Sequence, residues 1–271
     1  MTMSSPTLAF IGTGNLATAI VKGLLAQQAY RPSDLTCTSQ QGVTAQKLAL
    51  ATGISCEPDL PRLLASADTV FVAFKPQSLA GADPRLAELT AGKLIISVLA
   101  GKKLDRLAQF FPQARNIVRT MPNTPAAIGA AITPYCSLRP LAAGDQAIVT
   151  KILGALGQHL PLAEEYMDAV TVVSGSGPAF LFEFVAALRD GGITAGLPPA
   201  VAEKLALETV LGAAKLLAHT GTTPEVLRDQ VVSPNGTTFA GLQVMTEGQF
   251  RETIQAAILA GARRAAELSG A

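Results

Sequence analysis

The stretch "TLAFIGTGNLATAIVKGLLAQQ", residues 7–28, combines a short apolar strand, a glycine turn and an amphipathic helix. Its small residues follow the spacing G-x-G-x-x-A at Gly12, Gly14 and Ala17. Gly12 permits a tight turn, Gly14 lets the backbone approach a pyrophosphate, and Ala17 lets the helix pack closely on the strand. The amides at the start of the helix then face the phosphates. This context favours dinucleotide binding over a plain turn.

Four further strand candidates follow, separated by segments with helical periodicity. They cover residues 34–39, 69–74, 93–99 and 116–121. This alternation predicts an α/β fold, with an amino-terminal doubly wound parallel sheet of the Rossmann type. Such sheets bind ligands at the carboxyl ends of their strands. The residues expected there against the cofactor are Gly12, Thr13, Gly14, Asn15, Leu16, Ser39, Gln40, Ala73, Lys75, Pro76, Ala100 and Gly101.

The end of the second strand bears on the choice of cofactor. It reads "TSQQ", residues 38–41, without Asp or Glu. An acid at this position would bind the ribose 2′-hydroxyl and repel a 2′-phosphate. The neutral donors Ser39 and Gln40 favour NADPH, with NADH as the alternative.

The second half of the chain reads as helical. Strand signals stop at about residues 161–166, and amphipathic stretches follow at 178–195, 198–220 and 250–268. We therefore expect residues 1–163 to form the dinucleotide-binding domain and residues 164–271 an all-α domain. The apolar positions of these helices cover more than one face, which predicts a homo-oligomer built through this half.

Composition excludes several classes of function. Lys and Arg number 21 against 20 Asp and Glu, so the net charge of +1 gives no field for nucleic acid or an anionic membrane. The three cysteines, Cys37, Cys56 and Cys136, have no disulfide or zinc-site spacing, and we expect no metal. Without a signal-peptide pattern or an apolar run of roughly 20 residues, we expect a cytoplasmic protein.

The stretch "VVSPNGTTFAGL", residues 231–242, interrupts the helical pattern. Pro234 has a fixed φ, Asn235 and Gly236 favour positive φ, and Thr237 and Thr238 can cap a new helix. Taken alone, these residues indicate a turn between two helices. His159 lies in a strand-like stretch and His219 at a predicted helix end, so the sequence offers no obvious catalytic cluster.

Seven motifs together resemble the pyrroline-5-carboxylate reductase family over about residues 7–268. They are "FIGTGNLATAI", "AFKPQ", "SVLAG", "VRTMPNTPA", "SGSGPAF", "DGGITAGLP" and "LRDQVVSPNGTTFAGL", in family order and spacing. The resemblance implies a Rossmann domain, a helical dimerisation domain and NAD(P)H. It also implies reduction of the cyclic imine 1-pyrroline-5-carboxylate to proline, the last step of proline biosynthesis, in a site between cofactor and helices.

The resemblance also implies roles for individual residues. Thr238 contacts the ring nitrogen through its hydroxyl, Met121, Asn123 and Thr124 lie near the nicotinamide, and Ser176 lies near the substrate. The turn before Thr238 offers backbone amides to the substrate carboxylate. Ser233, Gly236 and Thr237 complete the expected substrate-binding set. Hydride transfer to an electrophilic C=N carbon needs neither a metal nor a protein nucleophile, so positioning can carry most of the catalysis.

Two positions depart from the family pattern, and two other functions stay open. Asn235 replaces a usual glycine, which should preserve the turn because Asn tolerates positive φ. Leu60 replaces an asparagine that contacts adenosine in many members. The alternatives are a β-hydroxyacid dehydrogenase, with Lys204 or Lys215 as acid–base group, and a non-catalytic NADP(H)-binding regulatory protein. Cofactor binding without imine reduction would identify the latter.

Overall fold

A computed structural model describes residues 7–269 of the chain. The chain forms two compact units. We call them the sheet unit, made of the residues up to Ser176 and those from Gly261 on, and the helical unit, Gly177–Ala260. Each unit is described by itself below.

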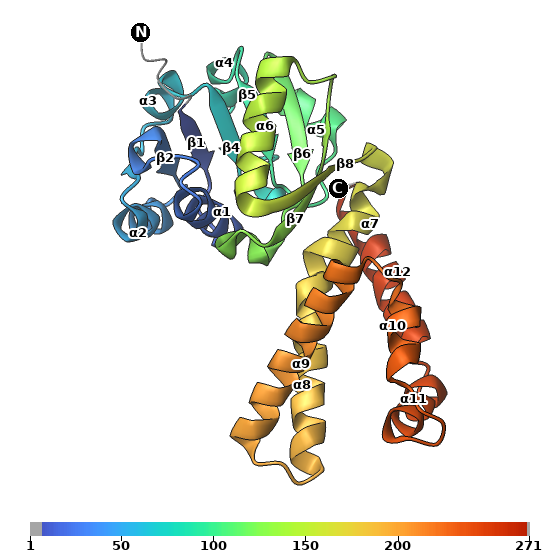
Figure 1. Cartoon of the computed structure of the whole chain (residues 1–271). Coiled ribbons are helices and arrows are strands. Elements are labelled where there is room, and N and C mark those ends of the chain that lie inside the picture. The colour runs from blue at the N-terminus through green and yellow to red at the C-terminus, as the bar shows by residue number, and fades with distance from the viewer. Residues whose placement is uncertain (1–6, 270–271) are drawn as a thin grey trace. The chain divides into compact units, whose positions relative to one another are not determined.

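One mixed sheet organises the sheet unit (Figure 1). Within the described residues it has eight strands in the order β3-β2-β1-β4-β5-β6-β7-β8, all parallel to their neighbours except the antiparallel pair β6–β7. The strands are β1 (Leu8–Ile11), β2 (Leu35–Thr38), β3 (Ser55–Cys56), β4 (Thr69–Val72), β5 (Leu94–Ser97), β6 (Asn116–Thr120), β7 (Ala131–Ser137) and β8 (Gly157–Pro161). The order reverses between β1 and β4, which is the switch point where doubly wound sheets bind ligands.

Helices cover both faces of this sheet. Side chains alternate between faces along β1, so Leu8 and Phe10 enter one buried cluster and Ala9 enters the other. The first cluster holds residues of α1 (Asn15–Ala26), α2 (Val43–Thr52) and α6 (Ala143–Leu156). The second holds residues of α3 (Leu60–Ala65), α4 (Leu86–Leu89), α5 (Leu104–Phe110) and α7 (Met167–Val170). These two apolar layers fix the strand ends that carry the site.

The helical unit begins where a π-helical segment, Thr171–Ser176, leads into α8 (Gly177–Thr194). It continues with α9 (Pro199–Thr220), α10 (Pro224–Val231), α11 (Thr237–Glu247) and α12 (Phe250–Ser269), the last of which ends in the sheet unit. Helices α8 and α9 pack side by side, with Ala202 buried close to Gly192. A left-handed glycine, Gly221 at φ 62°, ends α9 after its proline start.

The predicted fold class is confirmed, and four predicted strands and three predicted helices form within two residues of their expected bounds. Strand β7 was missed because it runs antiparallel to β6, so no crossover helix announces it, and because Pro134 interrupts its strand pattern. The two-residue β3 is too short to detect. The two compact units divide between Ser176 and Gly177, and the buried residues Met167 and Val172 belong to the sheet unit. The functional domain bounds expected from the sequence, 1–163 and 164–271, stay a prediction.

Candidate functional site

The turn after β1 requires glycine at Gly12. Its φ is 102°, and a Cβ there would lie 2.4 Å from the Phe74 nitrogen and 2.5 Å from the Ala73 carbonyl carbon. The Gly12 amide donates to the Thr38 carbonyl oxygen at 2.9 Å, and the Ala73 amide donates to that of Ile11 at 2.8 Å. Gly12 therefore sits where the ends of β1, β2 and β4 meet, and a side chain would separate them.

Gly14 has a different role, because the space beside it is open. It is the N-cap of α1, with φ −71° and ψ −176°, and no atom lies within 4 Å of where its Cβ would be. The amides of Asn15 and Leu16 open the helix without intrahelical acceptors, and no acidic residue lies in this first turn. The Thr13 hydroxyl contacts that of Thr44 at 2.7 Å and ties the turn to α2. The cradle fits a pyrophosphate.

The loop after β2 offers neutral donors. The Ser39 hydroxyl oxygen accepts the Ala45 amide at 3.3 Å, which leaves its own proton to donate, and Gln40 is exposed. No acid or base occurs in residues 38–45. Leu60, one of the two expected departures from the family pattern, opens α3 and packs against the second apolar cluster.

The ends of β4 and β5 bring the remaining predicted cofactor residues to the same edge of the sheet. Ala73 directly follows β4 and lies against Gly12. Lys75 is exposed, and Pro76 opens a short 3-10 turn. After β5, Ala100 precedes Gly101, which is buried with φ 72°.

Three predicted residues gather around the π-helical segment. The Asn123 side-chain nitrogen donates to the Ser174 carbonyl oxygen at 3.2 Å, and its oxygen accepts the Ile132 amide at 3.3 Å. A Cβ on Gly175 would lie 2.7 Å from the Met121 Cε. The Ser176 hydroxyl donates within the segment to the Thr171 carbonyl oxygen at 3.4 Å. Segments of this rare type often occur at functional sites.

Sequence reasoning missed a buried cation that supports this region. The Arg119 side chain on β6 is 3 % exposed and pairs with Glu164 at 3.0 Å and with Asp168 at 3.1 Å. A Glu164 oxygen also accepts the amide of Leu104 at 2.7 Å. The arginine thus links β6 to the segment before α8 and to the start of α5. A lone arginine in the apolar stretch "NIVRTM" was the available signal.

The predicted substrate loop, residues 233–238, lies in the helical unit. Gly236 donates its amide to the Ser233 carbonyl oxygen at 3.0 Å, with Pro234 and Asn235 between them. Asn235 has φ 56°, so the departure from glycine keeps a turn with positive φ at its third residue, as in type II. A Cβ on Gly236 would lie 2.3 Å from the Ser233 hydroxyl oxygen.

Helix α11 begins directly after this turn. Gly236 is its N-cap, with Thr237 and Thr238 as the first two helical residues and no acid in the first turn. The interpretation of Thr238 as the N-cap is therefore wrong. Thr237 is exposed and Thr238 half-buried, and the Thr238 hydroxyl makes no hydrogen bond within residues 7–269.

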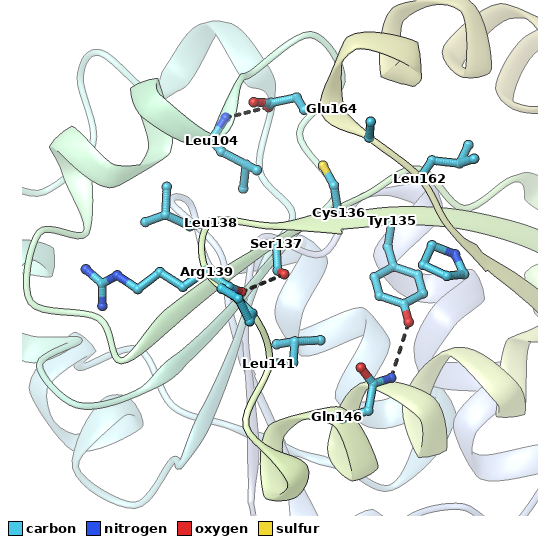
Figure 2. A pocket seen from close by; sticks show the side chains of 13 residues that line it. Leu104, Tyr135, Cys136, Ser137, Leu138, Arg139, Leu141, Gln146, Leu162 and Glu164 are labelled. Carbon is cyan, nitrogen blue, oxygen red and sulfur yellow. Dashed lines mark hydrogen bonds between the residues drawn. The ribbon is translucent and has the colours of Figure 1, made fainter.

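A separate cavity of about 430 Å³ contains none of the predicted site residues (Figure 2). Its polar side chains already have partners, because Gln146 donates to the Tyr135 hydroxyl at 3.2 Å and Ser137 donates to the Arg139 carbonyl oxygen at 2.8 Å. No cluster of His, Cys, Asp or Glu in the described range is arranged to hold a metal ion. The turn at Gly12–Gly14 in the sheet unit and the turn at Ser233–Gly236 in the helical unit are therefore the two candidate binding regions, each taken by itself.

Comparisons with known proteins identify the family of the chain. Residues 164–268 match the family model "Pyrroline-5-carboxylate reductase dimerisation", and residues 7–101 match "NADP oxidoreductase coenzyme F420-dependent". A pyrroline-5-carboxylate reductase of Arabidopsis thaliana is 39% identical over 96% of this chain and 94% of its own. One from Synechocystis is 40% identical over 96% and 97%.

A solved structure shows the same fold with a bound cofactor. The pyrroline carboxylate reductase of Plasmodium falciparum, with NADP bound, superposes with a TM-score of 0.88 at 25% identity, covering 98% of this chain and 99% of that one. Full-length similarity, a shared fold and the matched dimerisation region point the same way. The chain belongs to the pyrroline-5-carboxylate reductase family.

Proposed function

We propose that this protein reduces the C=N bond of 1-pyrroline-5-carboxylate to L-proline with hydride from NADPH, with NADH as a possible second donor. This is the last step of proline biosynthesis. The observation that carries the proposal is the presence, in one chain of this family, of two helices that begin after a glycine N-cap with no acidic residue in the first turn. One follows the Gly12–Gly14 turn at α1, and the other follows the Ser233–Gly236 turn at α11.

The sheet unit supplies the cofactor side. We assign the pyrophosphate to the open amides of Asn15 and Leu16, because a Cβ at Gly14 would occupy that space. Ser39 and Gln40 serve the adenosine end as neutral donors. Met121 and Asn123 form the nicotinamide side, held against the π-helical segment by their contacts with Gly175 and Ser174. NADPH supplies the hydride when bound, and these residues hold its ring in place.

The helical unit supplies the substrate loop. The amides of Thr237 and Thr238 open α11 and are suited to a carboxylate, whereas the Gly236 amide already donates to Ser233. We therefore assign Gly236 the close approach to Ser233 that sets the turn. Hydrogen bonds to a charged group contribute about 1.5–3 kcal/mol each.

Thr238 is the residue we assign to the ring nitrogen. Its hydroxyl has no partner within the described chain, so it is available to donate a hydrogen bond. As hydride adds to the ring carbon, the C=N π electrons become a nitrogen lone pair that can accept this bond. The interaction therefore strengthens along the reaction, which is the condition for lowering the barrier.

We infer a homo-oligomer, a dimer or an assembly of dimers, built through the helical domain. Large apolar side chains of α8 and α9 are exposed in the single chain, including Phe182 at 64% and Leu207 at 55%. By length and composition alone, one described helical stretch, Glu164–Thr194, could also cross a membrane. We favour a subunit contact, because this stretch falls in the region that matches the dimerisation model.

We also infer a cytoplasmic location and no nucleic-acid or membrane partner. All three cysteines are free thiols, which suits a reducing compartment. The net charge of +1 provides no field for a polyanion.

The test is the absorbance of NADPH during incubation of the full-length protein with pyrroline-5-carboxylate, with proline quantified in parallel. We expect loss of NADPH and gain of proline in equal amounts, and a parallel run with NADH gives the preference. A folded protein that binds NADPH without turnover would favour the regulatory alternative. Turnover of β-hydroxy acids with NADP instead would favour the dehydrogenase.

A further inference from the structure

Two cysteines lie opposite each other on neighbouring strands at the edge of the sheet. Cys37 on β2 and Cys56 on β3 are direct register partners in a parallel pair. Neighbouring strands lie about 4.8 Å apart. This spacing falls within the roughly 4.4–6.8 Å between Cα atoms that a disulfide requires.

The two side chains point to the same face of the sheet. Cys37 is fully buried in the first apolar cluster, and Cys56 is partly buried and packs against the same cluster. Burial raises the pKa of the Cys37 thiol to about 12, and the neighbouring Cys56 adds to that rise. Cys37 is therefore a neutral thiol at neutral pH, with a second sulfur beside it.

Of the two residues, Cys37 is buried and Cys56 is partly exposed. Cys56 lines an open surface cavity of about 460 Å³ with Gln46, Ala49, Leu50 and Ile54. Strand β3 has two residues and forms an edge of the sheet, so Cys56 has a paired strand on one side only. A small oxidant can therefore react with Cys56 first, and the buried Cys37 thiol then lies beside the oxidised Cys56 sulfur.

We propose that Cys37 and Cys56 form a peroxide-sensitive dithiol that closes reversibly to an intrachain disulfide between β2 and β3. Hydrogen peroxide is the oxidant. The Cys56 sulfur attacks one peroxide oxygen, the O–O bond breaks, and the leaving hydroxide takes the thiol proton, giving a sulfenic acid and water. The Cys37 sulfur then displaces hydroxide from the Cys56 sulfur, and the Cys37 proton converts that hydroxide into a second water. Two thiols lose two electrons, and one peroxide gains them.

Peptide mapping of the full-length protein tests this directly. The reduced protein is treated with a few equivalents of hydrogen peroxide while circular dichroism shows that it stays folded, and remaining thiols are then alkylated in denaturant. Lys47 lies between the two cysteines, so trypsin separates them unless a disulfide joins the peptides. We expect a disulfide-linked pair of peptides, whose mass is about two units below the sum of the two reduced, unalkylated peptides. This linked pair should disappear after reduction with dithiothreitol.

Cys136 provides the matched control, because it is buried on β7 opposite Arg119 rather than opposite a thiol. Cys136 should remain a thiol during the peroxide treatment and therefore be fully alkylated afterwards. The Cys136→Ser variant should still form the Cys37–Cys56 disulfide. In Cys56→Ser, Cys37 should stay alkylated under the same treatment. Oxidation of Cys56 to a trapped sulfenic or sulfinic acid with Cys37 still alkylated would overturn the proposal, as would no loss of either thiol in the folded protein.

Discussion

Replacing Gly12 by alanine should destabilise the sheet unit rather than simply weaken cofactor binding. A φ of 102° costs a non-glycine residue about 1–3 kcal/mol. The new Cβ would also lie within 2.6 Å of three backbone atoms of Ala73 and Phe74, and overpacking of this kind costs about 1–3 kcal/mol. We therefore expect a loss of about 3 kcal/mol or more, or a fall in Tm of roughly 6–12 °C.

Gly14→Ala is the matched control, because its φ and ψ suit alanine and no atom lies within 4 Å of the new methyl group. We expect a nearly unchanged Tm but at least about tenfold weaker NADPH binding, equivalent to about 1.4 kcal/mol, since the methyl occupies the pyrophosphate position. Thermal unfolding and fluorescence titration with NADPH measure both quantities. A Gly12→Ala protein that melts with the parent, or a Gly14→Ala protein with parental affinity, would refute the reasoning.

Three further outcomes are expected. Thr238→Ala should lower kcat about tenfold or more with unchanged NADPH affinity. Its Tm should also be unchanged, because Gly236 and not Thr238 is the N-cap. Thr238→Ser should restore kcat in steady-state kinetics, and equal kcat in both variants would remove the assigned role. Arg119→Met should cost about 2–4 kcal/mol in denaturant unfolding, because two carboxylates lose their buried partner; an unchanged midpoint would contradict this. Tyr30→Phe should raise stability by about 1 kcal/mol at pH 7, because the buried hydroxyl has no partner within the described residues. Burial raises the pKa of Tyr30 to about 12 in the folded protein, so the unfolded protein loses the Tyr30 proton at lower pH and the free energy of unfolding falls between about pH 10 and 12. Denaturant melts should show a smaller fall in this free energy for Tyr30→Phe than for the parent. Identical pH profiles would exclude Tyr30 as the cause.

Local signals predicted the core of the fold well. The G-x-G-x-x-A spacing and the alternation of strands and helices depend on neighbouring residues. They correctly predicted a doubly wound sheet and the tight turn at Gly12. Strand β7 was missed because it runs antiparallel to β6 and contains Pro134. The ion pairs of Arg119 were missed because they join residues 45 and 49 positions apart in the chain. The sequence alone gave no means of locating those partners.

The candidate site divides in the same way. Asn235 was expected to keep the turn because of its tolerance for positive φ, and its φ of 56° confirms this. The helix was expected to start at Thr237 and Thr238, but the alternative that made Thr238 its N-cap was wrong. Both Gly236 and the threonines are acceptable N-caps, and only the backbone conformation distinguishes them. The Asn123 bridge to Ser174 could not be predicted either, since it depends on the path of the π-helical segment.

Isotope transfer tests the central claim most directly. Full-length protein is incubated with pyrroline-5-carboxylate and NADPH that carries deuterium at both C4 positions of the nicotinamide, and the proline formed is analysed by mass spectrometry. The account predicts proline one mass unit heavier than the unlabelled product, with the deuterium on the former imine carbon. Unlabelled proline, or labelled NADPH that is bound but never consumed, would contradict direct hydride transfer at this site.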